Sequence, residues 1–207
     1  MVAAESEAKV DAAGPEEGEP TYAFKPNLVG SPWLLTLKPA GLAWDVGHRS
    51  GLVRYDRIRR VRLSFRPVTL QSHRFVTEIW SHDSPKIQFA SASWRSLVEQ
   101  ERLDAGYAAF VIELHRRLAA AGSTARFSSG MPAFAFWVGV AVFAGAMVAL
   151  VALIARALQA EQWAPTALIV GLFALFGWQI GDFLRRNRPQ TYRPDAPPPN
   201  VLPRAGR

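Results

Sequence analysis

Residues 127–181, FSSGMPAFAFWVGVAVFAGAMVALVALIARALQAEQWAPTALIVGLFALFGWQIG, decide the fold of this chain. No charged residue occurs in the 29 positions from Phe127 to Ala155, and a second uncharged run of 20 positions extends from Gln162 to Gly181. A bilayer core of roughly 30 Å needs about 20 helical residues, and apolar residues occupy every face of the first run. The stretch predicts a membrane-spanning helical hairpin, with helices at residues 131–155 and 163–184 and an outer loop at residues 156–162.

Arginines close to the two spans predict the orientation of the hairpin. The connecting loop contains only Arg156, whereas seven arginines flank the spans on the side of the chain termini. These seven are Arg116, Arg117, Arg126, Arg185, Arg186, Arg188 and Arg193. Because basic residues concentrate in cytoplasmic loops, both termini are expected in the cytoplasm. Asp182, one turn before Arg185, is expected to form an interfacial ion pair with it.

Small residues recur at four-residue spacing in both spans. They are Ala141, Gly145 and Ala149 in the first span, and Ala167, Gly171, Gly177 and Gly181 in the second. Small residues let membrane helices approach each other closely. The pattern predicts that the two spans pack on each other or that two copies form a homodimer, and the sequence leaves both alternatives open.

Length and composition leave room for one soluble domain before the hairpin. The chain has 207 residues and no cysteine, which excludes disulfides and thiolate metal sites. Residues 1–20 are acidic, lack the pattern of a signal peptide and predict a disordered tail. Residues 122–130 are expected to form a flexible linker, and the basic, proline-rich residues 185–207 an unstructured cytoplasmic tail.

Residues 21–121 have the pattern of an α+β domain. At least six short strands are expected between residues 21 and 91, and Val61, Leu63 and Phe65 alternate strictly with polar residues, as in a strand with one buried face. Residues 92–104 are expected to form a loop that ends in an N-cap at Asp104. An amphipathic helix follows, because one face gathers five apolar residues. These are Tyr107, Phe110, Val111, Leu114 and Leu118.

This chain order resembles the pleckstrin-homology-like (PH-like) domains of small bacterial membrane proteins. The resemblance covers residues 22–121 and rests on the strand-rich run, on the stretch Tyr55-Asp56-Arg57-Ile58-Arg59-Arg60-Val61 and on the terminal helix. It implies a curved antiparallel sheet or barrel closed by a C-terminal helix, on the cytoplasmic side of a bacterial inner membrane. It also implies a non-catalytic binding or scaffold role, without naming a ligand.

Sequence motifs for catalysis, cofactors and metals are lacking. The four histidines, His48, His73, His82 and His115, show no metal-ligand spacing. The sequence contains neither a phosphate-cradling glycine loop nor a nucleophile elbow. We therefore expect no enzyme activity, cofactor or metal. A membrane-bound enzyme or transporter accessory subunit with an unrecognised active part stays open as the alternative.

Basic residues gather in the predicted domain. Residues 21–118 contain fifteen lysines and arginines against eight acidic residues, and Arg60, Arg62 and Arg66 share the polar face of the alternating strand. This face is either a solvated sheet surface or a surface that contacts anionic lipid headgroups or an unknown partner protein. Nucleic acid is not favoured, because no aromatic platform interleaves the arginines.

Overall fold

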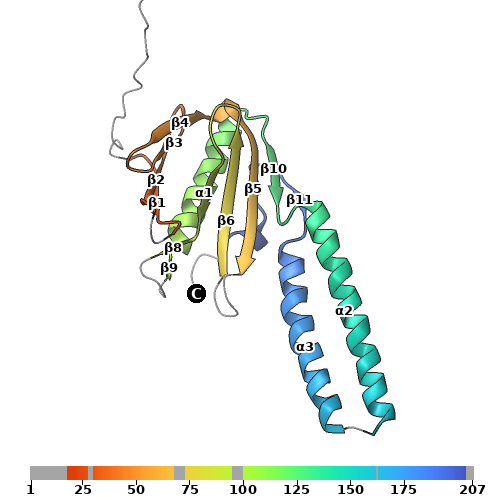
Figure 1. The fold of residues 1–207 in the computed structure, drawn as a ribbon. Coiled ribbons are helices and arrows are strands. Elements are labelled where there is room, and N and C mark those ends of the chain that lie inside the picture. The colour runs from red at the N-terminus through yellow and green to blue at the C-terminus, as the bar shows by residue number, and fades with distance from the viewer. Residues whose placement is uncertain (1–17, 28–29, 68–72, 95–99, 162, 204–207) are drawn as a thin grey trace, which may run out of the picture.

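The computed structural model describes residues 18–27, 30–67, 73–94, 100–161 and 163–203, and shows an α+β fold with three α-helices (Figure 1). The predicted acidic tail therefore falls largely outside the described residues. The strands are β1 (Thr21–Phe24), β2 (Trp33–Lys38), β3 (Gly41–Asp45), β4 (Ser50–Arg54), β5 (Ile58–Pro67), β6 (His73–Ser81), β7 (Ile87–Ala90), β8 (Ala92–Trp94), β9 (Gln100–Arg102), β10 (Arg126–Ser129) and β11 (Gln190–Thr191). The helices are η1 (Tyr55–Arg57), α1 (Asp104–Ala120), α2 (Ala133–Gln159), α3 (Trp163–Arg186) and η2 (Pro199–Val201).

Two sheets and α1 contribute to one hydrophobic core. The first sheet is an antiparallel meander of β1, β2, β3 and β4. The second has the order β11-β10-β5-β6-β7, in which β10 runs parallel to β5 and the other neighbours are antiparallel. Strands β8 and β9 form a separate pair, so part of the predicted loop at residues 92–104 is extended.

The buried face predicted for residues 60–66 and the amphipathic helix are confirmed, whereas Ser64, on the face predicted to be solvated, is also buried. Val61 and Leu63 are fully buried in β5, and all five apolar residues of the predicted helical stripe are buried in α1. Asp104 is the first residue of α1 rather than its cap. The N-cap is Leu103, which makes no capping hydrogen bond through its side chain.

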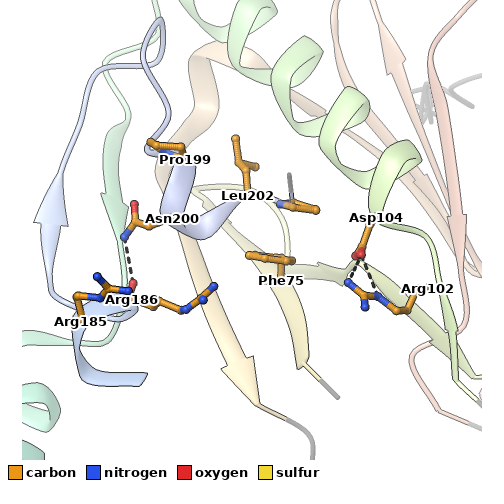
Figure 2. Close-up of a pocket in the computed structure, with 9 residues that line it drawn as sticks. Phe75, Arg102, Asp104, Arg185, Arg186, Pro199, Asn200 and Leu202 are labelled. Carbon is orange, nitrogen blue, oxygen red and sulfur yellow. Dashed lines mark hydrogen bonds and ion pairs between the residues drawn. The ribbon is translucent and has the colours of Figure 1, made fainter. Parts of the chain in front are cut away.

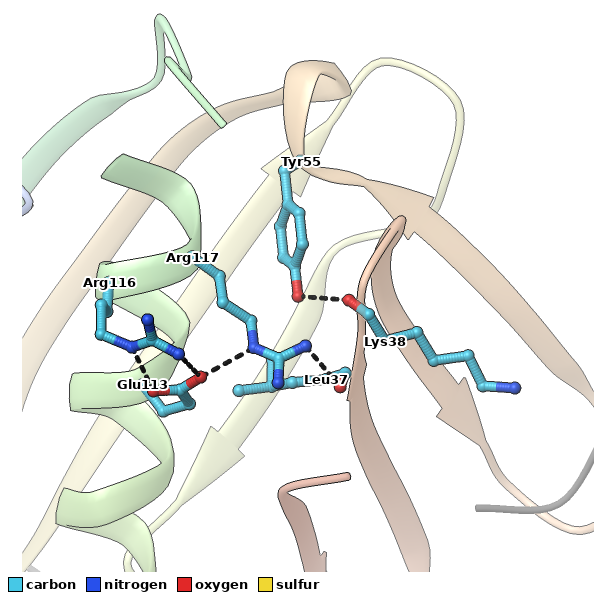
Figure 3. Close-up of polar contacts among 6 residues, drawn as sticks. All are labelled: Leu37, Lys38, Tyr55, Glu113, Arg116 and Arg117. Atoms are coloured by element: carbon cyan, nitrogen blue, oxygen red, sulfur yellow. Dashed lines mark hydrogen bonds and ion pairs between the residues drawn. The ribbon is translucent and has the colours of Figure 1, made fainter. Parts of the chain in front are cut away.

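Polar contacts fasten α1 to the first sheet (Figure 3). The Arg117 guanidinium donates to the Leu37 carbonyl oxygen at 2.8 Å, and both Arg117 and Arg116 bind the Glu113 carboxylate. The Tyr55 hydroxyl donates to the Lys38 carbonyl oxygen at 2.9 Å. The Arg117 contact therefore holds α1 at the end of β2, on the sheet that its apolar face covers, and the Tyr55 contact fixes η1 at the same end of β2.

Helices α2 and α3 form an antiparallel hairpin that extends away from the two sheets (Figure 1). Both helices are long and apolar enough to cross a membrane, and almost none of their most apolar windows is buried. Asp182 binds Arg185 at 2.9 Å and Arg186 at 2.6 Å. The predicted ion pair near the end of the second span is thus confirmed.

Larger side chains, rather than the predicted small residues, are shielded between the two helices. A Cβ atom added to Gly145, Gly171, Gly177 or Gly181 would meet no atom within 4 Å, and Ala141, Ala149 and Ala167 are exposed. The shielded positions of α2 instead include Phe136, Val140, Phe143, Met147, Leu150 and Ile154. Their seven-residue repeat is typical of helices that pack through large side chains. The homodimer alternative stays a prediction.

The hairpin leaves and re-enters the second sheet through paired strands. Strand β10 places Phe127 beside Val61 and Ser128 beside Arg62 in β5, and β11 pairs with β10 after the hairpin has returned. Between them, the Met131 amide donates to the Asn187 carbonyl oxygen at 2.9 Å. The prediction of a flexible linker at residues 122–130 is therefore wrong for residues 126–129, because their backbone is paired with a distant strand.

The prediction of an unstructured tail at residues 185–207 is also wrong for most of its length. After β11 the chain turns back under the domain, and Val201 of η2 is fully buried in the core. The Asn187 side chain accepts a hydrogen bond from the Phe65 amide at 3.3 Å. Apolar residues between the prolines, such as Val201, close the core where the C-terminal segment packs against it. The proline-rich composition of this segment does not indicate such burial.

Candidate functional site

The outer face of the second sheet carries the arginines that the sequence predicted to share one face. Their neighbours in β6 follow from the antiparallel register of the strands. The facing pairs are Arg60 with Trp80, Arg62 with Glu78 and Arg66 with Arg74. An indole and a carboxylate therefore lie directly beside the arginine stripe.

Glu78 is a buried carboxylate, 1% exposed, that binds three cations. Nε and Nη2 of Arg62 lie 2.7 and 2.6 Å from Oε2, and Nη2 of Arg66 lies 3.3 Å from Oε1. The Lys86 ammonium also donates to Oε1. Burial by itself raises the pKa of Glu78, but hydrogen bonds from Lys86 and Arg62, together with the charges of Arg62 and Arg66, outweigh it and hold the pKa below its ordinary value. Glu78 is thus an ionised anchor for the cations around it.

Trp80 provides a second attachment for the same cations. The guanidinium carbons of Arg60 and Arg62 lie 5.7 and 5.0 Å from a Trp80 ring centre, and Lys86 Nζ lies 5.2 Å away. These distances are within the range of cation–π attraction. We define the basic cluster as Arg60, Arg62, Arg66, Glu78, Trp80 and Lys86. Its four cations and one carboxylate give it a net charge of +3.

The sequence predicted half of this cluster. Strand alternation placed Arg60, Arg62 and Arg66 on one face, but Glu78, Trp80 and Lys86 were missed because their approach depends on the pairing of β5 with β6 and of β6 with β7. The available signal was the spacing of Glu78 and Trp80, which lie two positions apart in the predicted strand Phe75–Trp80 and therefore share one face of it. The Arg62 side chain is only 18% exposed, so it is a packed residue rather than a freely solvated one.

A pocket of about 420 Å³ lies between the basic cluster and the first apolar helix. We call it the junction pocket. Among the residues that line it are Arg60, Arg62, Ser128, Pro132, Ala133 and Gln190, from β5, β10, β11 and the start of α2. Pro132 is the N-cap of α2, and the first turn of this helix has no acidic residue. The cationic face of the sheet therefore meets the electropositive end of a helix here.

A pocket of about 500 Å³ lies under the domain, where the C-terminal segment passes between α1 and the second sheet (Figure 2). Arg102, Arg185 and Arg186 line it together with Phe75 and Leu202. Arg102 binds Asp104 at 2.9 Å, and Arg185 and Arg186 both bind Asp182. Two carboxylates thus offset three arginines, which leaves a smaller excess of positive charge than in the basic cluster.

No protein-family model, curated protein or solved structure matches this chain. Its function must therefore be argued from the geometry of the described residues. The ligand chemistry that suits the basic cluster and the junction pocket is anionic, because guanidinium groups and free helical N–H groups are both hydrogen-bond donors.

His115 lies outside both pockets and joins α1 to the C-terminal segment. Its Nδ1 is 2.7 Å from the Val111 carbonyl oxygen and its Nε2 is 2.9 Å from the Tyr192 hydroxyl. Burial lowers the pKa of His115, so the imidazole is neutral at physiological pH. Within the described ranges, no three histidine, aspartate or glutamate side chains gather in a group that could hold a metal ion.

Proposed function

We propose that this protein is a membrane-anchored, non-enzymatic binding domain that contacts anionic lipid headgroups through its basic cluster. In this proposal α2 and α3 cross a bacterial inner membrane, both termini are cytoplasmic, and the domain formed by the two sheets and α1 lies on the cytoplasmic surface. The four-stranded meander β1–β4, followed in the chain by the antiparallel strands β5, β6 and β7 and, after the β8–β9 pair, by α1, supports a PH-like fold for that domain.

The observation that carries the proposal is the direct connection between the sheet that bears the basic cluster and the two apolar helices. Arg62 lies beside Ser128 in β10, and only three residues separate β10 from α2. A paired strand cannot swing as a flexible linker does, so the cluster stays close to the membrane surface. Each basic residue held near an anionic surface contributes about 1 kcal/mol.

The pairing of β10 with β11 also supports the proposed topology. Strands that share a sheet lie on the same side of a membrane, so the two ends of the hairpin must do so as well. The excess of arginines at those ends over the loop at Arg156 favours the cytoplasm for that side.

Lipid selectivity in bilayers tests this function. The full chain would be reconstituted in phosphatidylcholine bilayers, and its association with spin-labelled phosphatidylglycerol would be compared with that of spin-labelled phosphatidylcholine. We expect a preference for phosphatidylglycerol that weakens with salt. The double variant Arg60→Ser/Arg66→Ser should reduce the preference for phosphatidylglycerol, because it removes two cations from the basic cluster. Arg62 and Lys86 remain in this variant to neutralise Glu78.

A matched control is the double variant Arg49→Ser/Arg59→Ser, which removes the same charge from two exposed positions outside the basic cluster. This control should keep the preference for phosphatidylglycerol close to that of the natural chain. Equal preferences in both double variants would overturn the proposal and favour a protein partner for this face.

A further inference from the structure

We propose that the junction pocket binds the phosphate of one anionic phospholipid as a defined site, distinct from diffuse attraction to the basic cluster. This inference rests on the proposed function, because it assumes that α2 enters the membrane beside the pocket. It goes further by assigning particular donors and a particular lipid class to one location.

Uncompensated positive charge is the first reason. Arg60 makes no ion pair with a described residue. Its register partner in β10 is Arg126, which also makes no ion pair with a residue that the structure describes. Two like charges side by side on adjacent strands repel each other. Arg126 does not line the junction pocket, but an anion bound there beside Arg60 would lower the repulsion between the two guanidinium groups.

The remaining donors of Arg62 are the second reason. Its Nε and Nη2 both bind Glu78, so that edge of the guanidinium is occupied, whereas Nη1 bonds no residue that the structure describes. The pocket thus receives donor groups from two arginines, and none of the described residues that line it is a carboxylate. The pocket under the domain differs in this respect, because Asp104 lines it.

The start of α2 contributes donors of another kind. The first hydrogen bond of this helix runs from the Phe136 amide to the Pro132 carbonyl oxygen, so the amides of residues 133–135 have no partner within the helix. Pro132 makes no capping hydrogen bond through its side chain. A phosphate oxygen close to Ala133 would satisfy such amides.

The height of the pocket relative to the bilayer selects a lipid phosphate as the anion. The 27 residues of α2 span about 40 Å at 1.5 Å per residue, which exceeds a hydrocarbon core of about 30 Å. In the proposed topology, this excess leaves room for the first turn of α2 in the headgroup layer. Phe134 and Trp137, which follow the pocket-lining residues, are 83% and 66% exposed, as expected of aromatic residues that contact lipid at the interface.

Binding of a water-soluble, short-chain phosphatidylglycerol to the full chain in detergent tests the site. Thermal unfolding of the protein would be followed against the concentration of this lipid, of short-chain phosphatidylcholine and of glycerol phosphate. We expect saturable stabilisation by phosphatidylglycerol and a smaller effect of phosphatidylcholine. Equal stabilisation by glycerol phosphate would show that a free phosphate, rather than a lipid, occupies the site and would overturn the lipid assignment.

The variants Arg60→Gln and Arg66→Gln separate the pocket from the surrounding charge. Both remove one cation from the basic cluster, but only Arg60 lines the junction pocket. Arg60→Gln should weaken phosphatidylglycerol binding about fivefold, the change that corresponds to about 1 kcal/mol for one basic residue, and Arg66→Gln should leave it nearly unchanged.

Equal losses in these two variants would reject the pocket while leaving lipid contact by the whole face intact. Loss of all lipid preference in the bilayer experiment would instead reject the proposed function. The variant Ser128→Leu provides an independent check, because it fills the junction pocket without altering charge. We expect it to reduce saturable binding of phosphatidylglycerol, and unchanged binding would contradict the proposed location.

Discussion

At the scale of single residues, Glu78 determines how the arginines of the outer face are arranged. A charge that is 1% exposed is tolerated only when it is paired, and here three cations share it. The sequence showed the arginines as a stripe, since alternation in one strand is a local property. It did not show the acid beneath them, because the register of two strands depends on the whole sheet.

Removing Glu78 should therefore cost more stability than removing an exposed acid. We expect Glu78→Gln to lower the free energy of unfolding by about 2–4 kcal/mol, because Arg62, Arg66 and Lys86 lose a buried counter-charge. Thermal unfolding of the full chain in detergent measures this loss. The control Asp56→Asn breaks the exposed pair with Arg54 and should change little. Similar losses in both variants would show that Glu78 is no anchor.

The buried His115 predicts a dependence of stability on pH. Burial lowers its pKa below the ordinary 6.5, so the folded state binds a proton less readily than the unfolded state does. Its contribution to stability is complete above about pH 6.5 and is lost as the pH falls through lower values. His115→Gln should lose less stability than the natural chain between about pH 7 and pH 5. A slope for His115→Gln equal to that of the natural chain would contradict the prediction.

At the scale of elements, long periodic segments were predictable and short paired segments were not. The buried apolar stripe of α1, with its five predicted residues, and the lengths of α2 and α3 follow from patterns within one segment. Strands β10 and β11 have four and two residues and are stabilised by partners far away in the chain. Their sequences, RFSS and QT, are short and lie next to Gly130 and Pro189, so that nothing local distinguishes either strand from a loop.

The C-terminal element η2 should contribute to stability although it lies in a proline-rich segment. We expect Val201→Ala to lower the free energy of unfolding by about 1–3 kcal/mol, because a fully buried side chain leaves a cavity. Val201→Asp should cost more, since it buries an unpaired charge. Thermal unfolding and limited proteolysis of the full chain measure both effects. Asp195→Ala, an exposed change in the same segment, is the control, and equal behaviour of all three variants would indicate a segment detached from the core.

At the scale of the whole molecule, the domain formed by the two sheets and α1 is joined to the hairpin at both ends of the hairpin. Strand β10 precedes α2, whereas Asn187, β11 and η2 follow α3 and pack back on the same sheet and core. The sequence separated these parts into domain, linker, anchor and tail, because composition changes sharply between them. The structure connects them, because pairing and burial act between residues that are distant in sequence.

The return of the chain after α3 also constrains the order of biogenesis. Strand β11 and Val201 are synthesised after both apolar helices, so the ribosome releases the last pieces of the core only once the entire hairpin has been made. Under the proposed topology, the domain reaches its final form after membrane insertion. A chain inserted with its two ends on opposite sides of the membrane could not pair β11 with β10. Its core would stay incomplete and exposed to proteases. The domain therefore folds completely only in chains whose hairpin is inserted in the proposed way.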